Sequence, residues 1–217
     1  MPQNKVVALR RADSNDVDKI IRICRLFVHN VRYQTPIKNL KPLFINIMNS
    51  DSCEVYVASL NDEIVGFVIL TLDLLEFEKI VNRNKPFFWI RFITILFHPT
   101  TLKYTLKKKW EKLMLNLFEN KTTGNKTIKN NTLDSHYKEE IIISHIAVNN
   151  KYQRMGIAKY ILCMIEKRAV ELKRFTIKLN TFNIYKSAIS LYESCGYVRS
   201  DKNNKNKDRI EFKKTIV

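Results

Sequence analysis

The stretch IAVNNKYQRMGIAK, at residues 146–159, decides the fold of this chain. A β-branched segment runs into a polar turn, and the turn leads into a helix that opens with Gly156. The first turn of a helix leaves backbone N–H groups without intrahelical partners, and the helix dipole adds partial positive charge there. Gly156 also lets a ligand approach the main chain closely. The stretch therefore predicts a phosphate-binding turn at the start of a helix.

The segment after the turn has the pattern of an amphipathic helix. Its apolar residues recur at helical spacing: Ile157, Ile161, Ile165, Ala169 and Leu172. Neither G-x-G-x-x-G nor G-x-x-x-x-G-K-[ST] occurs, so the dinucleotide and P-loop interpretations lose their main support. The structural alternative is an ordinary strand-to-helix turn whose glycine serves packing.

A second informative stretch is TFNIYKSAISLYESCGY, at residues 181–197. One helical stripe contains Ala188, Leu191, Tyr192 and Cys195, and Gly196 stands where a left-handed cap would end the helix. Helical spacing alone favours Tyr192 as a core aromatic residue.

Together, the two stretches resemble the GCN5-related N-acetyltransferase (GNAT) superfamily. Gln153-x-x-Gly156-x-Ala158 is similar to its acyl-CoA pyrophosphate loop, Q/R-x-x-G-x-G/A. Residues 188–197 are similar to its second motif, A-x-x-L-Y-E-x-x-G-F/Y, and the two motifs occur in the expected order. The chain departs from the family at Tyr185, where Asn is usual; Asn183 lies two residues earlier.

The resemblance implies an α/β acyl-CoA N-acyltransferase fold with a mixed central sheet, helices on both faces and a helical insertion. It implies an enzyme that passes an acetyl group from acetyl-CoA to a primary amine by direct attack, without a covalent enzyme intermediate and without a metal. The acceptor would be a small-molecule or peptide amine. A non-catalytic acyl-CoA sensor and a basic RNA-associated protein are the alternatives.

The resemblance also assigns roles to residues. The cofactor-binding set is Ile146, Val148, Gln153, Arg154, Met155, Gly156, Ile157, Ala158 and Asn183. Within it, the backbone N–H groups of residues 154–158 would take the pyrophosphate, and Ile146 and Val148 would offer main-chain partners to the pantetheine arm. The N–H of Val148 would stabilise the oxyanion, and Tyr192 would protonate the departing thiolate.

The general base does not follow from the motifs, because Ile142 stands where several family members carry Glu. Regular alternation along residues 141–148 would put Glu140, Ser144 and Ile146 on one face and His145 on the other. Glu140 and Ser144 are therefore the predicted candidates, and His145 is predicted to lie in the core. A water chain without a dedicated side-chain base is the alternative.

Composition bounds the class of protein. The 217 residues, 45% of them hydrophobic, fit a single domain over residues 1–217. The net charge of +17 is spread with Lys and Asn over the whole chain, so no dedicated nucleic-acid binding is predicted. Residues 1–16 lack an apolar run, and the apolar stretch 87–97 is too short to span a membrane. The four cysteines and four histidines are scattered, which predicts no metal site. We expect a soluble, cytoplasmic protein.

The element order predicted from periodicity is that of the superfamily, with one disturbance. Strands are predicted over residues 6–9, 54–60, 64–72, 141–148, 175–179 and 210–216, and two further helices over about 17–28 and 36–48. Between them lies an insert, about 74–138, which is too long for a structureless loop. Its aromatic stretches predict helices near 87–96 and 101–117, and a similar insert occurs in a bacterial subset of the superfamily. We expect the insert to form part of the acceptor pocket; a membrane-surface contact or a homodimer contact are the alternatives.

Overall fold

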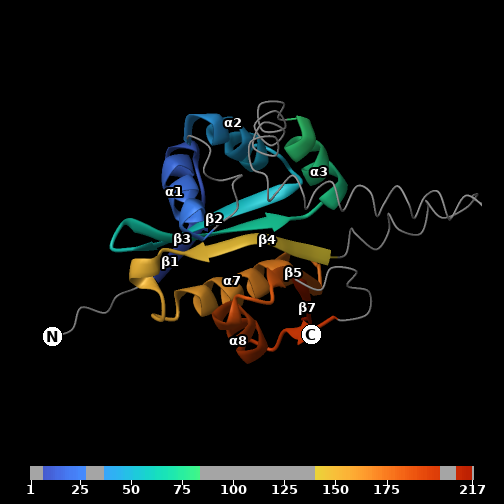
Figure 1. Cartoon of the computed structure of the whole chain (residues 1–217). Coiled ribbons are helices and arrows are strands. Elements are labelled where there is room, and N and C mark those ends of the chain that lie inside the picture. The colour runs from blue at the N-terminus through green and yellow to red at the C-terminus, as the bar shows by residue number, and fades with distance from the viewer. Residues whose placement is uncertain (1–6, 28–36, 84–139, 201–208, 217) are drawn as a thin grey trace, which may run out of the picture.

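The computed structural model describes residues 7–27, 37–83, 140–200 and 209–216, and these residues form a three-layer α/β sandwich (Figure 1). The sheet has seven strands in the order β1-β2-β3-β4-β5-β7-β6. The strands are β1 (Val7–Arg11), β2 (Cys53–Leu60), β3 (Glu63–Thr71), β4 (Glu140–Val148), β5 (Thr176–Phe182), β6 (Val198–Arg199) and β7 (Arg209–Thr215). Neighbouring strands are antiparallel except β4 and β5, which run parallel, so the sheet is mixed.

Helices cover both faces of the sheet, as Figure 1 shows. On one face lie α1 (Val17–Phe27), α2 (Ile37–Met48) and α3 (Leu74–Arg83), and on the other α7 (Ile157–Glu171) and α8 (Lys186–Ser194). Each face has its own core. The first, the α1/α2 core, contains Ile20, Phe44 and Phe67 among others; the second, the α7 core, contains Ile161, Ile165 and Phe212.

The mixed sheet with helices on both faces confirms the fold class predicted from the motifs. The predicted strands and helices outside the insert are all present, with ends shifted by a few residues. The short strand β6, the 3-10 turns at Ser14–Asp16 and Asn150–Tyr152, and helix α3 were not predicted. Helix α3 occupies the first part of the insert. The two aromatic helices expected near 87–96 and 101–117 lie outside the described residues.

The alternation of side chains along β4 is interrupted by a bulge, and this corrects one prediction. In the ladder with β3, Ile69 pairs with His145 but Leu70 pairs with Ile143, so Ser144 is an extra residue without a partner position. The Ser144 side chain nevertheless lies on the same face of the sheet as Thr71, because the two hydroxyl oxygens are 2.6 Å apart.

The bulge reverses which face the following side chains occupy. Ile146 packs into the α7 core with Ile143, whereas Ala147 packs against the α1/α2 core. His145 stands opposite Ile69, a residue of the α1/α2 core, and directly opposed residues of a ladder share a face. The prediction that separated His145 from Ser144 is therefore wrong, because both side chains lie on the α1/α2 face. Ile146, predicted to share a face with Ser144, lies on the other.

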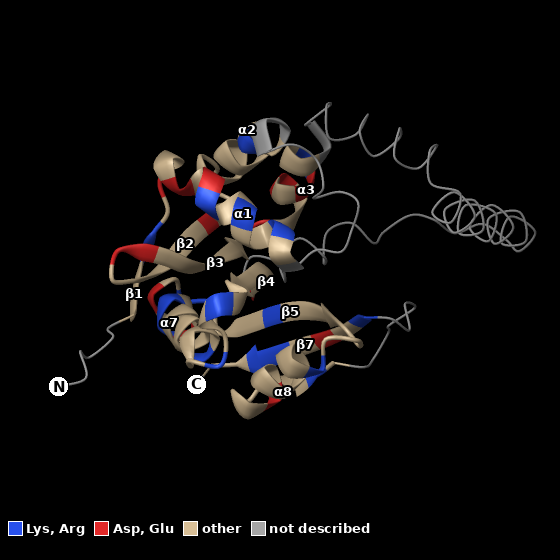
Figure 2. Ribbon diagram, turned by 60° about the vertical axis from the view of Figure 1, so that its left-hand side comes forward, with Lys and Arg blue, Asp and Glu red and all other residues tan. Residues whose placement is uncertain are grey.

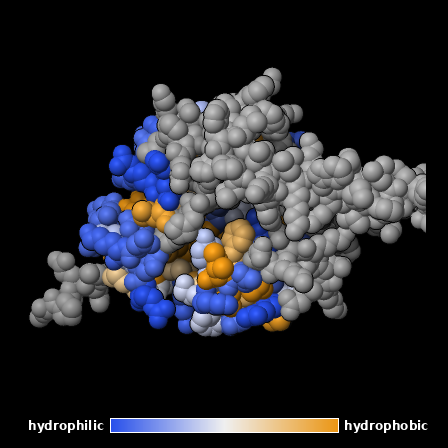
Figure 3. Space-filling model, in the orientation of Figure 1, coloured by the Kyte–Doolittle hydropathy of each residue, from blue (hydrophilic) through white to orange (hydrophobic). Residues whose placement is uncertain are grey.

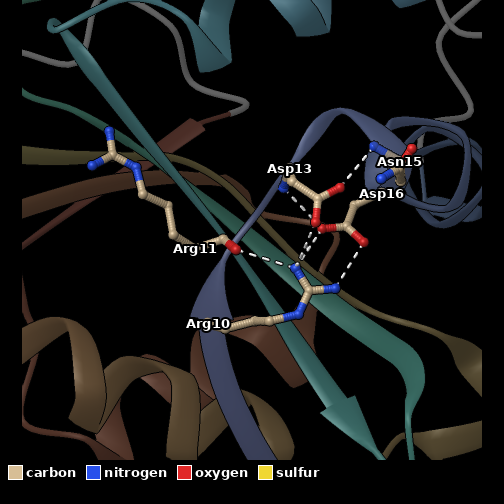
Figure 4. A network of polar contacts seen from close by, with 5 residues as sticks. All are labelled: Arg10, Arg11, Asp13, Asn15 and Asp16. Atoms are coloured by element: carbon tan, nitrogen blue, oxygen red, sulfur yellow. Dashed lines mark hydrogen bonds and ion pairs between the residues drawn. The ribbon is translucent and has the colours of Figure 1, made fainter.

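A charged cluster fixes the junction between β1 and the first helix (Figure 4). Asp16 is 4% exposed, and its carboxylate accepts two hydrogen bonds from the Arg10 guanidinium, at 2.6 and 2.8 Å. Asp16 also accepts from the backbone N–H of Asp13, while the Asp13 side chain accepts from that of Asn15. This capping box satisfies donors that the helix start would otherwise leave unpaired.

Candidate active site

An opening in the pairing of β4 with β5 leaves main-chain groups of β4 without partners on β5. The two parallel strands pair only from Glu140 to Ile143 of β4, opposite Thr176 to Leu179 of β5. Beyond Ile143, β4 continues its ladder with β3 while no further pairing with β5 is formed in the described part of the sheet. The strands thus separate where β4 approaches the predicted phosphate turn.

The register shows which groups of β4 face this opening. The N–H of Asn149 donates to Val65 O at 2.7 Å, and Gly66 pairs with Val148. Hydrogen-bonded and non-hydrogen-bonded pairs alternate in an antiparallel ladder, so Ala147 also bonds to β3. The N–H and C=O groups of Ile146 and Val148 therefore point the other way, toward β5. These are the two residues that the resemblance assigns to the pantetheine arm.

The turn after β4 is held by its own side chains. Gln153 donates through Nε2 to Asn150 Oδ1 at 2.9 Å and, at 3.4 Å, to the carbonyl oxygen of Val148. The Tyr152 hydroxyl donates to a carboxylate oxygen of Glu63, in the β2–β3 hairpin, at 2.5 Å. The side chain of Gln153 is thus engaged within the turn, which it fixes against the end of β4.

The start of helix α7 is not capped by a side chain. Gly156 is the N-cap of α7 with φ +79°. A Cβ atom placed on Gly156 would meet nothing within 4 Å, so the space above the main chain is open. Arg154 also has positive φ, +63°, which a side chain other than Gly rarely adopts. The N–H groups of Ile157 and Ala158, in the first turn of α7, have no partner within the helix, an arrangement that favours an anion.

Tyr192 is part of the α7 core. Its side chain is 6% exposed and belongs to the same core as Val148 and Ile157. Its ring centroid is 5.5 Å from that of Phe212 and 6.2 Å from that of Tyr197. Burial raises the pKa of Tyr192 to about 12, so the hydroxyl remains protonated at neutral pH.

Asn183 follows β5 directly, since that strand ends at Phe182. Because β4 and β5 are parallel, their carboxyl ends share one edge of the sheet, and Asn183 is therefore on the same edge as Val148. The surface near this edge is partly apolar: Met155 is 46% exposed and Ile184 68%. Figure 3 shows hydrophobic residues at the surface, interspersed with hydrophilic ones, in the coloured part of the molecule.

The candidates for a general base lie in different places. Glu140 is the first residue of β4, eight positions before Val148, or about 26 Å along a strand at roughly 3.3 Å per residue. Its carboxylate lies 2.6 Å from Lys178 Nζ. Ser144 is half-buried and closer, at the bulge. His145 beside it was predicted to lie in the core rather than to act as the base, and burial lowers its pKa to about 4.

Neither the basic residues nor the possible metal ligands of the described ranges indicate a second binding site. Figure 2 shows Lys and Arg on α1, α7, β5 and β7, separated by uncharged residues rather than gathered on one element. Within the described ranges, no group of three or more His, Cys, Asp and Glu side chains is placed to hold a metal ion. None of the described helices combines the length and apolar character needed to cross a membrane.

Comparison with known proteins agrees with this geometry. The family model of the acetyltransferase (GNAT) domain matches residues 119–199, which include both motifs. No curated protein matches the sequence. Among solved structures, an N-acetyltransferase from Staphylococcus aureus Mu50 superposes with a TM-score of 0.59 at 12% identity, over 98% of this chain and 99% of that chain.

Two further structures have the same fold. The PaiA N-acetyltransferase from Thermoplasma acidophilum, in complex with coenzyme A, has a TM-score of 0.56 at 10% identity, over 97% of this chain and 99% of that one. A spermidine N-acetyltransferase chimera from Vibrio cholerae and hSSAT has a TM-score of 0.57 at 11% identity, over 96% and 95%. Residues 119–199 thus match the acetyltransferase (GNAT) domain model, and the chain has the fold of these solved structures.

Proposed function

We propose that the protein transfers an acetyl group from acetyl-CoA to a primary amine by direct attack. One observation carries the proposal: the main-chain groups of Ile146 and Val148 face the opening between β4 and β5, directly before the uncapped helix start at Gly156. A diphosphate and the arm attached to it need such an arrangement, an anion site beside a strip of main-chain donors and acceptors that do not pair with a neighbouring strand.

Each part of the cofactor has a partner in this proposal. The N–H groups of residues 154–158 bind the diphosphate, and the exposed guanidinium of Arg154 adds positive charge beside them. Ile146 and Val148 bond the pantetheine arm through their main chain, and Asn183 contributes from the end of β5. Gln153 contributes indirectly, since its bond to Asn150 holds the turn in shape.

The reaction requires a donor for the oxyanion and an acid for the leaving thiolate. The N–H of Val148 points into the opening and serves as the first; losing one such donor typically slows a reaction about 10²- to 10³-fold. Tyr192 serves as the acid, and its pKa of about 12 keeps it protonated, and so able to donate, at neutral pH. The amine must also lose a proton. Ser144 at the bulge, or a water beside it, takes that role, whereas Glu140 is too far along the strand and engaged with Lys178.

The experiment that tests the proposal has two readouts. Acetyl-CoA and CoA should raise the thermal unfolding temperature of the protein, and thiol release should appear when acetyl-CoA is mixed with a panel of polyamines, aminosugars and peptide amines. Tyr192→Phe should slow thiol release by about 10²- to 10⁴-fold and leave the CoA-induced thermal shift unchanged. Tyr197→Phe, which alters a neighbouring ring of the same core, is the matched control and should keep its turnover.

Other outcomes identify the alternatives. A thermal shift with CoA, but no thiol release with any amine, would indicate an acyl-CoA sensor. No shift with CoA, together with RNA binding that weakens steeply with salt, would indicate an RNA-associated protein. The proposed part of the insert in acceptor binding is tested by deleting residues 85–131: unchanged acceptor affinity in a folded variant would exclude it.

A further inference from the structure

A chain of hydroxyl and thiol groups crosses three strands from Ser144 to the turn before β2. Ser144 Oγ lies 2.6 Å from Thr71 Oγ1, and Thr71 stands directly opposite Cys53 in the β2–β3 ladder. Cys53 Sγ lies 3.6 Å from Ser52 Oγ, which in turn lies 2.7 Å from Ser50 Oγ. Either atom can be the donor in each of the measured contacts, so the chain can point in both directions.

The inner groups of this row are more deeply buried than the two at its ends. The inner members are enclosed, with Thr71 1%, Cys53 0% and Ser52 7% exposed, whereas Ser50 and Ser144 at the two ends are half-buried. Hydroxyls in a core must be desolvated and gain little net stability from pairing with each other. Valine at position 71 would fill the same volume without that cost. A row of polar groups inside the α1/α2 core, with half-buried residues at both ends, therefore calls for a role beyond packing.

Ser144, the end of the path that is nearer to β5, lies on the α1/α2 face of the sheet, the face that an acceptor would use. The diphosphate turn belongs to the α7 side of the sheet, so an arm passing from it through the β4–β5 opening emerges toward the α1/α2 side. Ser144 lies on that face, two residues before Ile146, whose main chain borders the opening. The amine therefore meets the acetyl group on the side where Ser144 is found.

We propose that Ser144, Thr71, Cys53, Ser52 and Ser50 relay the proton of the acceptor amine to solvent, an inference that rests on the proposed function. As the amine nitrogen bonds to the acetyl carbon, its proton passes to Ser144 Oγ, whose own proton passes to Thr71. Each following group accepts one proton and releases one, and water at Ser50 takes the last. After the transfer, the row of hydroxyl and thiol groups carries no net charge and its hydrogen bonds point in the opposite direction. Rotation of the hydroxyls restores the original direction.

The relay needs a thiol that stays protonated, and the surroundings of Cys53 provide this. Burial raises the pKa of the Cys53 thiol; hydrogen bonds from Ser52 and Thr71 act against that shift and Asp73 adds to it. At neutral pH the sulfur therefore carries a hydrogen that it can donate while it accepts another. Serine at this position would keep the path, and alanine would interrupt it.

The test uses thiol release from acetyl-CoA with the amine of the panel that the parent protein acetylates fastest. Thr71→Val and Cys53→Ala interrupt the path, and we expect each to lower kcat by about 10-fold or more. Imidazole is a small base that can reach half-buried Ser144. Adding it to the assay should restore much of the lost kcat. Cys53→Ser should stay within about 2-fold of the parent. Cys24→Ala removes another buried thiol of the same core and is the matched control.

The outcomes separate the relay from the function on which it rests. Parent-like turnover in folded Thr71→Val, or a loss that imidazole does not restore, would overturn the relay and leave the acetyltransferase proposal standing. If Thr71→Val does not fold, equal turnover of the Cys53→Ala and Cys53→Ser variants overturns it in the same way. If the parent releases no thiol with any amine, the proposed function fails, and the relay fails with it.

Discussion

Gly66 lies directly opposite Val148 in the β3–β4 ladder, beyond Ile143, the last residue of β4 that pairs with β5. A Cβ atom on Gly66 would come within 2.9 Å of the carbonyl oxygen of Ala147 and 3.3 Å of a methyl group of Val148. The nearest of these contacts is with backbone, which cannot move aside without shifting the strand. The absence of a side chain at Gly66 therefore sets how closely β3 approaches the residue proposed to stabilise the oxyanion.

Gly66→Ala should accordingly affect both stability and turnover. Forcing the methyl group into this contact should lower the free energy of unfolding by about 1–3 kcal/mol, as overpacking does in other cores. It should also displace the N–H of Val148 and reduce kcat more than the affinity for acetyl-CoA. Urea unfolding and steady-state kinetics measure the two effects. A variant with parental stability and kcat would show that β3 adapts freely at this point.

Gly156→Ala and Gly196→Ala form a matched pair, because both glycines have positive φ, +79° and +81°. Each alanine should cost about 1–2 kcal/mol of unfolding free energy through backbone strain alone. At Gly196 the added methyl would make only an ordinary contact, 3.7 Å, with Lys214. Only Gly156 borders the proposed diphosphate site, so calorimetric titration with CoA should show weaker binding for Gly156→Ala alone. Equal affinities in the two variants would place the diphosphate elsewhere.

Tyr197→Phe should leave the protein as stable as the parent or make it more stable. The Tyr197 hydroxyl is buried and has no hydrogen-bond partner among the described residues, and burial raises its pKa. A buried polar group without a partner costs about 1–3 kcal/mol, so its removal should raise the free energy of unfolding by up to about that amount. Thermal and urea unfolding measure the change. A clear loss of stability would mean that the hydroxyl has a partner.

Sequence alone predicted the features that depend on neighbours along the chain. The helix start at Gly156 and the left-handed cap at Gly196 are local, and the structure has both, with the N–H of Tyr197 donating to Tyr192 O beyond the cap. The bulge at Ser144 depends on the register with β3, which no property of β4 encodes. For the same reason neither the close approach of Gly66 nor the face of the sheet on which His145 lies could be predicted.

Asp16→Asn should reveal how the first helix is held to β1. The hydrogen bonds from Arg10 lower the pKa of Asp16, so the carboxylate stabilises the fold at pH values above the ordinary Asp pKa of about 4. That contribution is lost as pH falls through the lowered pKa. The variant should lose about 1–3 kcal/mol of unfolding free energy at pH 7, and the difference from the parent should shrink in acid.

A matched control for Asp16 is an ion pair exposed to solvent. Glu76 and Lys79 are 2.9 Å apart in α3, with side chains 40% and 61% exposed. Glu76→Gln should change the unfolding free energy by less than about 1 kcal/mol. If Asp16→Asn were no more harmful than Glu76→Gln at pH 7, the buried carboxylate would not anchor the junction.

His145→Gln should alter how stability depends on pH between about 4 and 6.5. Burial lowers the pKa of His145 to about 4, below the value of about 6.5 expected in the unfolded chain. Between these values the unfolded chain binds more protons than the folded protein, so the parent loses stability as pH falls through this range. Between pH 7 and pH 5 the unfolding free energy of the variant should fall by less than that of the parent. Urea unfolding at both pH values measures the two changes. Because the other three histidines are unchanged in the variant, the difference reports His145 alone, and parallel curves would show that its imidazole is not shielded from water.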